Sequence, residues 1–287
     1  MPELPEVETI VSHLQPALHG AVVRSVVVLR TAAIRHGRRK LSSSLPGRRI
    51  ERIGREGKWI IFHLRPAAEL VVHLGMTGRL TITPAKAQAA KHTHVRLQFV
   101  DRADELRFTD PRRFGGVWFF DGDETDAARR LRGLGPDALS IRVADLRDIC
   151  RRRRQIKALL LDQRAISGMG NIYCDEALFA TKIHPLTKAS DLTEEQVRSL
   201  ACSIRKTLRT AIESGGSTLR DYRRPDGSEG RFLEIRAIYG REGQPCRRCG
   251  ETILRIQAAG RSSHICPACQ KSRRKRRLTT EAGKPLK

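Results

Sequence analysis

Long apolar runs are missing from this sequence of 287 residues. No stretch approaches the ~20 apolar residues that a helix needs to cross a bilayer. No amphipathic Lys/Arg helix with a face of Trp, Phe and Leu marks a membrane-surface protein. The first residues include Glu3, Glu6 and Glu8, where a secretory signal peptide has basic residues and then a hydrophobic segment. We therefore expect a cytoplasmic protein that has no membrane partner.

Acidic residues are scarce relative to basic ones. The chain has 55 Lys and Arg residues against 31 Asp and Glu, and its sequence pI is about 10.9. A basic surplus of this size predicts a polyanionic partner, because neutralising the phosphates of a nucleic acid releases condensed counterions. The length allows two domains, each with its own hydrophobic core. The composition therefore favours a nucleic-acid-binding protein with two basic domains.

Cysteine is infrequent and unevenly placed, with seven in the chain. Cys150, Cys174 and Cys202 stand alone in helical patterns, where we expect small buried hydrophobic residues. The others form two Cys-x2-Cys pairs with sixteen residues between them: Cys246, Cys249, Cys266 and Cys269. This spacing predicts two knuckles that close one tetrahedral zinc site. A disulfide framework is the alternative, but a reducing cytosol disfavours it.

The amino terminus carries a second chemical signal. Removal of Met1 would make Pro2 the terminal residue, with a secondary amine that titrates near ~8 rather than the ~10.4 of lysine. A neutral amine adds to an aldehyde carbon to give an iminium, or Schiff base. Glu3 and Glu6 lie within one helical turn of it, close enough for proton exchange with a substrate. The alternative is that these prolines and acids only begin a helix, which they suit by residue type.

Periodicity divides the chain into a strand-rich part and a helical part. A helix is predicted over 5–18, followed by short strands at 22–29, 58–64, 70–74, 79–83, 94–100, 105–109 and 116–120. That many short strands predict an antiparallel sandwich or barrel. The segment 131–142, with its glycines and proline, is the expected linker. Helices are predicted at 144–152, 154–162, 172–180 and from Thr193, where Thr193 and Gln196 fit a capping box.

A series of motifs recurs along the chain in a specific order. The N-terminal PELPEVET is followed by EGKW at 56–59, HLGMTG at 73–78, KHTHV at 91–95, DPRRFG at 110–115, GMGNIY at 168–173, GGSTLRD at 215–221 and GRSS at 260–263. With the four cysteines, this series strongly resembles the formamidopyrimidine-DNA glycosylases. These bacterial base-excision enzymes remove 8-oxoguanine and ring-opened purines. The resemblance runs from Pro2 to about Gln270.

The resemblance implies an α+β multidomain fold. It consists of an N-terminal helix with an antiparallel β-sandwich, a helical domain with a helix-two-turns-helix element, and a C-terminal four-cysteine zinc ribbon. The corresponding parts are a catalytic domain at 1–135, a helical domain with a lesion-capping loop at 136–239, the zinc ribbon at 240–270, and a basic, disordered tail at 271–287. The implied partner is damaged double-stranded DNA, the implied cofactor is one structural zinc, and the protein is expected to be a monomer.

Catalytic roles are implied residue by residue. Pro2 matches the family's nucleophile for sugar C1′, and Glu3 matches the proton donor that helps to open the deoxyribose. Glu6 matches a second acid near the lesion. Lys58 matches the lysine assigned to β-elimination and phosphate contact; without this match, a solvent-exposed lysine at a strand edge would be preferred. Arg261, expected at the tip of a zinc hairpin, matches an arginine that grips phosphates and assists δ-elimination.

Other positions match DNA contacts of the family. His92, Arg152 and Asn171 match phosphate or basic DNA-binding positions, and Asn171 stands at a helix start, where free N–H groups favour phosphate. Asn171 would also suit a plain N-cap, and the arginines at 151–154 would suit a solvated helix face. Residues matching those that fill the gap left by an everted base are Met76, Arg112 and Phe114. The alternative for Met76 and Phe114 is a place in the core.

The sequence departs from the family's pattern at two positions. Thr93 stands where the family commonly has Asp, so a carboxylate that would orient His92 is missing. Arg231 stands where an aromatic residue is common, within the segment 217–239 that resembles the lesion-covering loop. The rivals are an endonuclease VIII-like enzyme for oxidised pyrimidines, a non-catalytic DNA-binding relative, and a ribosomal-RNA-binding zinc ribbon. The 110–115 motif and the long loop favour the purine enzyme over the first of these.

Overall fold

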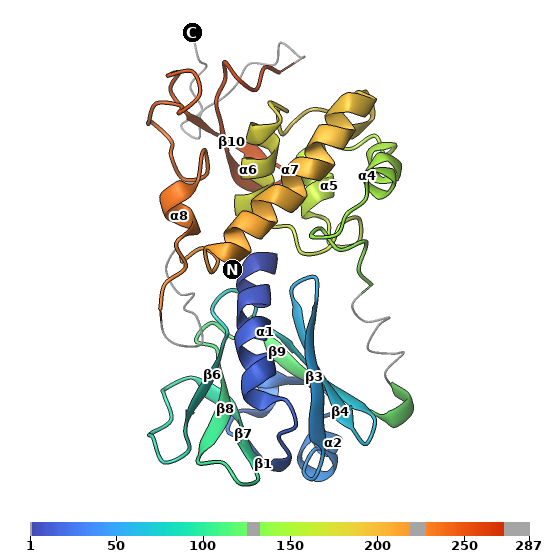
Figure 1. Cartoon of the computed structure of the whole chain (residues 1–287), viewed down its shortest axis with the longest axis vertical. Coiled ribbons are helices and arrows are strands. Elements are labelled where there is room, and N and C mark those ends of the chain that lie inside the picture. Colours follow the sequence, from blue (N-terminus) through green and yellow to red (C-terminus); the bar gives the residue numbers. More distant parts are fainter. Residues whose placement is uncertain (1, 125–132, 219–227, 273–287) are drawn as a thin grey trace. The chain divides into compact units, whose positions relative to one another are not determined.

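The computed structural model describes residues 2–124, 133–218 and 228–272. The chain forms two compact units, one of Met1–Gly133 with Ile212–Leu233 and one of Leu134–Ala211 with Glu234–Lys287 (Figure 1). The boundary after Gly133 lies inside the predicted linker. The family resemblance implies that Ile212–Leu233 belong to the helical domain, whereas their contacts join them to the N-terminal unit. Most of the predicted basic tail and the middle of the predicted lesion-covering loop lie outside the described residues.

The N-terminal unit contains two sheets (Figure 1). The four-stranded sheet has the order β1 (Val23–Val28), β7 (Thr93–Phe99), β8 (Asp104–Thr109), β6 (Arg79–Pro84). The five-stranded sheet has the order β2 (Ile34–His36), β9 (Gly116–Asp121), β5 (Ala68–His73), β4 (Trp59–Arg65), β3 (Arg49–Glu56). Neighbouring strands are antiparallel except for β2 and β9, which are parallel.

All seven predicted strands are present in these sheets, with ends shifted by one or two residues. Strands β2 and β3 and helix α2 (Arg38–Ser44) were not predicted from the sequence. In β3 only Ile50 and Ile53 are buried, and their odd spacing follows from a register shift between Ile50 and Arg52. A bulge of this kind breaks the strict alternation by which a strand is predicted from sequence.

Helix α1 (Leu4–Leu18) is built into the core of the same unit. Proline occupies its first turn, where no intrahelical N–H bond is lost. Val7, Ile10 and Leu14 on its apolar stripe join one hydrophobic cluster with Phe99 of the first sheet and Phe62 of the second. Because a buried side chain of this size stabilises the fold by about 1.5–3 kcal/mol, the start of α1 is held firmly against the sheets.

The second unit is helical and ends in a zinc ribbon. Its helices are α4 (Val143–Cys150), α5 (Ile156–Leu161), α6 (Asn171–Ala180) and most of α7 (Glu194–Glu213), and strands β10 (Leu254–Ala258) and β11 (Arg261–Ile265) form a hairpin. The short α8 (Phe232–Ile235) spans the second division between the units. Within the described residues, short 3-10 helices also form at Thr31–Ala33, Gly122–Glu124 and Ala189–Asp191. None of the described helices has the length and apolar character needed to cross a membrane.

Helix α7 confirms one local prediction and corrects another. Thr193 N donates to Gln196 Oε1 at 3.0 Å and Gln196 N donates to Thr193 Oγ1 at 3.2 Å, which is the predicted capping box. Cys150 and Cys174 are buried as expected, but Cys202 is exposed. The buried stripe of α7 contains Ala201 instead, so the adjacent cysteine falls on the solvent side of the helix.

Candidate active site

The N-terminal segment holds a buried acidic cluster. Pro2 is buried, and the side chains of Glu3 and Glu6 are only 4% and 1% exposed. Glu3 precedes the helix in an extended conformation, and its backbone N–H donates to Glu6 Oε2 at 2.8 Å. These residues do begin a helix, as the simpler interpretation held. However, acids that serve only a helix start are usually solvent-exposed, so the burial of both requires a further explanation.

Glu6 connects the start of α1 to a distant segment of the same unit. While Oε2 accepts from Glu3, Oε1 accepts the backbone N–H of Ser217 at 2.6 Å. Gly216 makes this approach possible: its φ is +83°, and a Cβ there would lie 3.0 Å from Glu6 Oε1. Phe232 N donates back to Gly216 O at 3.1 Å. Glu6 therefore holds the base of the predicted lesion-covering loop against the N-terminal helix.

Lys58 lies in the tight turn between β3 and β4, after Gly57, whose φ is +56°. Its side chain is only 6% exposed, so it is not the solvent-exposed lysine that the alternative interpretation required. Burial, and then the positive charge of Lys58, lower the pKa of His73 to about 4. His73 is therefore neutral at pH 7, and Lys58 is near enough to influence its charge.

Sequence reasoning assigned no role to His73. Its Nδ1 accepts the Gly75 N–H at 3.1 Å, so the proton of the neutral ring is on Nε2, where it is a hydrogen-bond donor. The ring packs against Trp59 with centroids 4.7 Å apart. His73 could have been found from its position in the sequence. It lies near the end of a predicted buried strand, just before Gly75, and that strand pairs with the one that follows the lysine motif.

Met76 and Phe114 lie on two turns that pack closely together. They are 38% and 56% exposed. The alternative interpretation, which placed both residues in the core, is therefore wrong. A Cβ on Gly75 would overlap the backbone of Phe114 and Gly115, which shows how closely the turns approach. The Arg112 guanidinium lies 4.8 Å from the centre of the Phe114 ring. This corner of the unit thus presents a flexible thioether, an aromatic ring and a guanidinium to solvent.

The Asp110 carboxylate holds both turns in place through hydrogen bonds. Its Oδ1 accepts the Thr77 hydroxyl at 2.6 Å and the Arg112 N–H at 3.3 Å, while Oδ2 accepts the Gly115 N–H at 2.8 Å. His94 Nε2 donates to the Asp110 carbonyl oxygen at 2.8 Å. Asp110 is completely buried, so these bonds are made where an unpaired partner would cost about 1–3 kcal/mol.

Two of the remaining predicted DNA contacts, His92 and Arg152, are solvent-exposed. His92 is exposed at the start of β7, and the neighbouring Thr93 is buried with its hydroxyl 3.2 Å from that of Thr109. Arg152 is exposed in the turn between α4 and α5. Of its neighbours, Arg151 pairs with Asp148 at 3.5 Å and Arg154 pairs with Asp162 at 2.9 Å. Arg152 is thus better placed than these two to offer its charge to a partner.

Arg261 follows the tip of the β10–β11 hairpin. Ala259 and Gly260 form the two-residue turn with φ values of +53° and +69°, the pattern of a type I′ turn. Arg261 is exposed directly after this turn. Asn171 lies in the same unit, and its Nδ2 donates to Ser262 O at 2.9 Å. Asn171 is the first residue of α6 rather than its N-cap, because Gly170 takes the cap position.

Helix α6 anchors the hairpin through buried charges that sequence reasoning missed. Asp175 Oδ1 accepts from Lys157 Nζ and from Ser263 Oγ, both at 2.7 Å, and Oδ2 accepts from His264 N at 2.9 Å. The Glu176 carboxylate accepts three successive backbone N–H groups, those of residues 237–239, at 2.8–2.9 Å. A buried lysine and two buried acids in helical patterns gave no sequence signal of these partners, because the partners are distant in the chain.

The four paired cysteines form a metal centre. Their sulfur atoms all lie within 4.8 Å of one another, and Cys249 Sγ is 3.4 Å from Cys266 Sγ and 3.5 Å from Cys269 Sγ. Tetrahedral zinc with Zn–S bonds of ~2.3 Å places sulfur atoms about 3.8 Å apart. Disulfide sulfurs are ~2.05 Å apart. The donor set therefore fits one structural zinc, as the sequence predicted, and does not fit a disulfide framework.

Three segments of the chain match models of known protein families. Residues 1–117 match the formamidopyrimidine-DNA glycosylase N-terminal domain, 134–223 its H2TH domain, and 243–271 a zinc finger found in FPG and IleRS. The chain belongs to the formamidopyrimidine-DNA glycosylase family. The formamidopyrimidine-DNA glycosylase of Thermus thermophilus is 44% identical over 276 residues, which cover 94% of this chain and 98% of that protein.

Solved structures of the family agree with the fold. A mutant of the Lactococcus lactis FPG, in complex with a Fapy-dG containing DNA, matches with a TM-score of 0.88 and 33% identity. The L. lactis Fpg with an abasic site containing DNA matches with a TM-score of 0.87 and 32% identity. Both alignments cover 94% of this chain and 100% of the solved chain. The predicted fold, with its helix, antiparallel sheets, helical domain and zinc ribbon, is confirmed.

Burial of His73 predicts a pH-dependent stability. Its pKa falls from 6.5 to about 4 on folding, so the unfolded chain binds the proton more tightly. The stabilising contribution is complete above pH 6.5 and is lost as the pH falls towards 4, by up to about 3 kcal/mol. In urea unfolding at pH 7.5 and at pH 4.5, the wild type should lose clearly more stability than His73→Gln. Equal losses in the two proteins would contradict a desolvated, neutral His73.

Proposed function

We propose that the protein is a bifunctional DNA glycosylase and AP lyase that excises oxidised purines, namely 8-oxoguanine and formamidopyrimidines, from duplex DNA. The observation that carries the proposal is the buried cluster of Pro2, Glu3 and Glu6 in a unit that also contains the shielded Lys58. The structures of the L. lactis Fpg include a mutant in complex with a Fapy-dG containing DNA and a complex with an abasic site containing DNA, which supports both the substrate class and the second activity.

In the first step, the amine of Pro2 attacks sugar C1′ and the damaged base leaves. Glu3 protonates the ring oxygen, so that the deoxyribose opens and the bond between Pro2 and C1′ becomes an iminium. The iminium acidifies the neighbouring C2′ position. Loss of that proton expels the 3′ phosphate by β-elimination, and δ-elimination then expels the 5′ phosphate. Hydrolysis of the iminium returns the free amine.

The contacts of the two acids support a division of labour between them. Both oxygens of Glu6 accept backbone N–H groups, from Glu3 and from Ser217, and such bonds favour the charged carboxylate. Glu6 is therefore suited to position Pro2 and the loop base rather than to deliver protons. Glu3, which directly follows the nucleophile, is the proton donor in this scheme, and Lys58 assists β-elimination.

Phosphate binding is assigned to four donors, of which Arg261, His92 and Arg152 are exposed and Asn171 is half-buried. We assign Arg261, Asn171, His92 and Arg152 to the DNA backbone, with Arg261 also assisting δ-elimination. The anchoring of β11 by Asp175 supports this assignment, because Ser263 and His264 are tied down two and three residues after Arg261. A guanidinium on a fixed strand binds phosphate with a smaller loss of entropy than one on a flexible loop. The neutral His73, with its proton on Nε2, is a further donor.

An enzyme that acts on a base inside a duplex must evert that base, at a cost of a few kcal/mol. Met76 and Phe114, exposed on adjoining turns, are suited to fill the gap, as apolar wedges do in DNA-kinking proteins. Arg112, held over the Phe114 ring, offers donors to the Watson–Crick acceptors of an orphaned cytosine. These assignments are supported by the exposure of all three side chains.

Replacement of the wedge should separate excision from lyase activity. Phe114→Ala should slow excision from a lesion duplex at least tenfold, while cleavage of a pre-formed abasic site changes much less, because that site needs no base eversion. The melting temperature should stay within about 2 °C of wild type, since the side chain is 56% exposed. Arg112→Ala should weaken the preference for lesions opposite cytosine. A strongly destabilised Phe114→Ala protein with normal excision per folded molecule would contradict the wedge.

A panel of lesion duplexes tests the proposed substrate class. The proposal predicts incision of 8-oxoguanine and formamidopyrimidine duplexes well above that of thymine glycol or 5-hydroxycytosine duplexes. The reverse order would support the endonuclease VIII-like alternative. Tight binding of lesion duplexes without incision of any of them would support a non-catalytic relative.

A further inference from the structure

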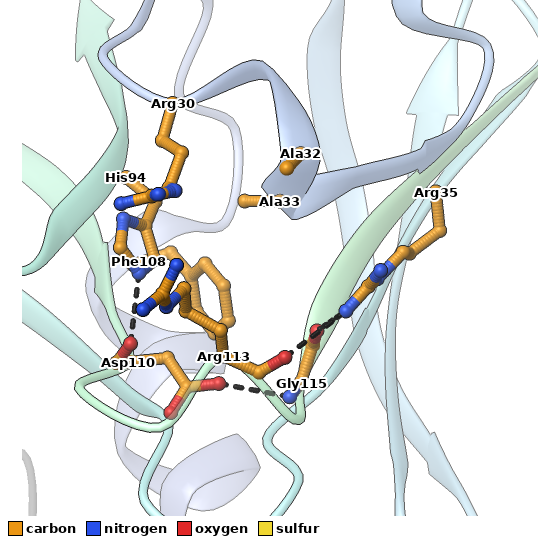
Figure 2. A pocket seen from close by; sticks show the side chains of 9 residues that line it. All are labelled: Arg30, Ala32, Ala33, Arg35, His94, Phe108, Asp110, Arg113 and Gly115. Atoms are coloured by element: carbon orange, nitrogen blue, oxygen red, sulfur yellow. Dashed lines mark hydrogen bonds between the residues drawn. The ribbon is translucent and has the colours of Figure 1, made fainter.

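A pocket of about 150 Å³ lies in the N-terminal unit. The residues that line it are distant from Pro2 in the sequence. Its walls are the segment Arg30–Arg35, one residue each from β7 and β8, and the turn at 110–115 (Figure 2). The pocket lining includes Arg113 and Gly115, the residues on either side of the exposed Phe114. Whatever binds there therefore lies next to the proposed wedge.

Three arginines line this pocket: Arg30, Arg35 and Arg113. Figure 2 shows Arg35 reaching the far side of the turn, where it donates to the carbonyl oxygens of Arg113 at 3.1 Å and Gly115 at 3.2 Å. Among the described residues, none of the three arginines forms an ion pair with a carboxylate. Clustered guanidinium groups repel one another, so an arrangement of this kind favours the binding of an anion.

The carboxylate that lines the pocket does not neutralise these arginines. Asp110 uses one oxygen for the Thr77 hydroxyl and the Arg112 N–H, and the other for the Gly115 N–H. His94 is fixed by its bond to the Asp110 carbonyl oxygen (Figure 2). Three formal positive charges against one negative charge leave the pocket cationic, and its acid is committed to holding the turn in shape.

The backbone of the turn separates the roles of two adjacent arginines. Arg113 has a φ of +60°, a left-handed conformation that is uncommon outside glycine. Its side chain lines the pocket, while that of Arg112 lies over the Phe114 ring. The turn thus presents one guanidinium to the wedge and the next to the pocket.

We propose that this arginine pocket binds a phosphate group, and that the phosphate is a backbone phosphodiester beside the base step that Phe114 enters. Phosphate oxygens accept several guanidinium N–H groups at once, which suits Arg30 and Arg113, while Arg35 holds the backbone of the turn. A phosphodiester held there would fix the duplex against the wedge while the damaged base leaves. The inference rests on the proposed function and adds a contact that orients the DNA for eversion.

Salt dependence tests the pocket directly. The affinity for a lesion duplex would be measured from 50 to 300 mM KCl for wild type, Arg30→Gln, Arg113→Gln, the double variant and Arg39→Gln. Arg39 is exposed on α2 and does not line the pocket, so it is the matched control. Loss of one phosphate contact lowers the slope of log K against log[salt] by about 0.9. We expect this change in both single variants, no further change in the double variant, and the wild-type slope in Arg39→Gln.

Two further arms identify the source of the phosphate. In a series of duplexes, one phosphate at a time would be replaced by a neutral methylphosphonate. When the replaced phosphate is the one that the pocket binds, wild type and Arg30→Gln should bind the duplex with equal affinity. Thermal unfolding without DNA, in inorganic phosphate and in chloride of equal ionic strength, tests a free ion. Phosphate stabilisation that Arg30→Gln removes, together with an unchanged salt slope, would assign the pocket to free phosphate and overturn the DNA contact.

Wild-type slopes in Arg30→Gln and Arg113→Gln would also overturn the proposal, as would a fully additive loss in the double variant. If Arg113→Gln is unstable, Arg30→Gln alone still tests the pocket, because Arg30 is exposed and its replacement should not affect folding. Failure of the proposed function would look different, because wild type itself would then neither bind nor incise the lesion duplex.

Discussion

Protein that keeps an extension on Pro2 should lose strand incision by at least a thousandfold, a loss typical for removal of a catalytic nucleophile. The reason is chemical: a Pro2 nitrogen that is acylated by Met1 or by a tag is an amide, and an amide cannot form an iminium. Incision of an abasic duplex would be measured with protein whose N-terminus is established by intact mass spectrometry.

Duplex binding should remain within a few-fold of wild type, because the proposed phosphate donors are unaffected. The matched control carries the same extension after Lys287 and should retain full activity. Full lyase activity from protein shown to keep Met1 would sink the assignment of Pro2 as nucleophile.

Cys249→Ser should lose zinc and lesion-DNA affinity together. Metal binding supplies folding energy to small ribbons of this kind, and the zinc knuckles share a small core with Phe179 of α6 and Ile238. Without that core the hairpin and its Arg261 are no longer held, so we expect duplex affinity to fall on the order of 100-fold, about 2.7 kcal/mol. Metal analysis and fluorescence anisotropy would measure both effects.

Cys202→Ser is the matched control, since Cys202 is exposed on α7 and is not one of the clustered cysteines. It should keep one zinc per chain and normal affinity. If Cys249→Ser kept wild-type DNA affinity after losing its zinc, the ribbon would not be needed to present Arg261.

The sequence was most informative where local chemistry determines the outcome. The strand runs, the capping box at Thr193 and the cysteine spacing depend on neighbours in the chain, and the structure confirms all three. Short or irregular elements such as β2 and β3 were missed because a three-residue strand and a bulged one carry no clear period.

The sequence predicted the functional residues of the site, but not the contacts that hold those residues in place. Motifs identified Glu6, Lys58 and Phe114, yet nothing local indicated that Glu6 accepts the N–H of Ser217, 211 residues away. The same holds for Asp175, whose bonds to β11 span 88 and 89 residues. Such supports depend on tertiary contacts between groups whose residue types are common on any surface, so they become visible only once the chain is folded.

Covalent trapping tests the central claim most directly. The protein would be incubated with a duplex containing an abasic site in the presence of sodium borohydride, and the adduct would be digested and mapped by mass spectrometry. An iminium on Pro2 predicts a stable protein–DNA adduct on the N-terminal peptide, with the added mass on the proline nitrogen, and none from the extended protein. An adduct on a lysine, or no adduct from protein with a free Pro2 amine, would contradict the account.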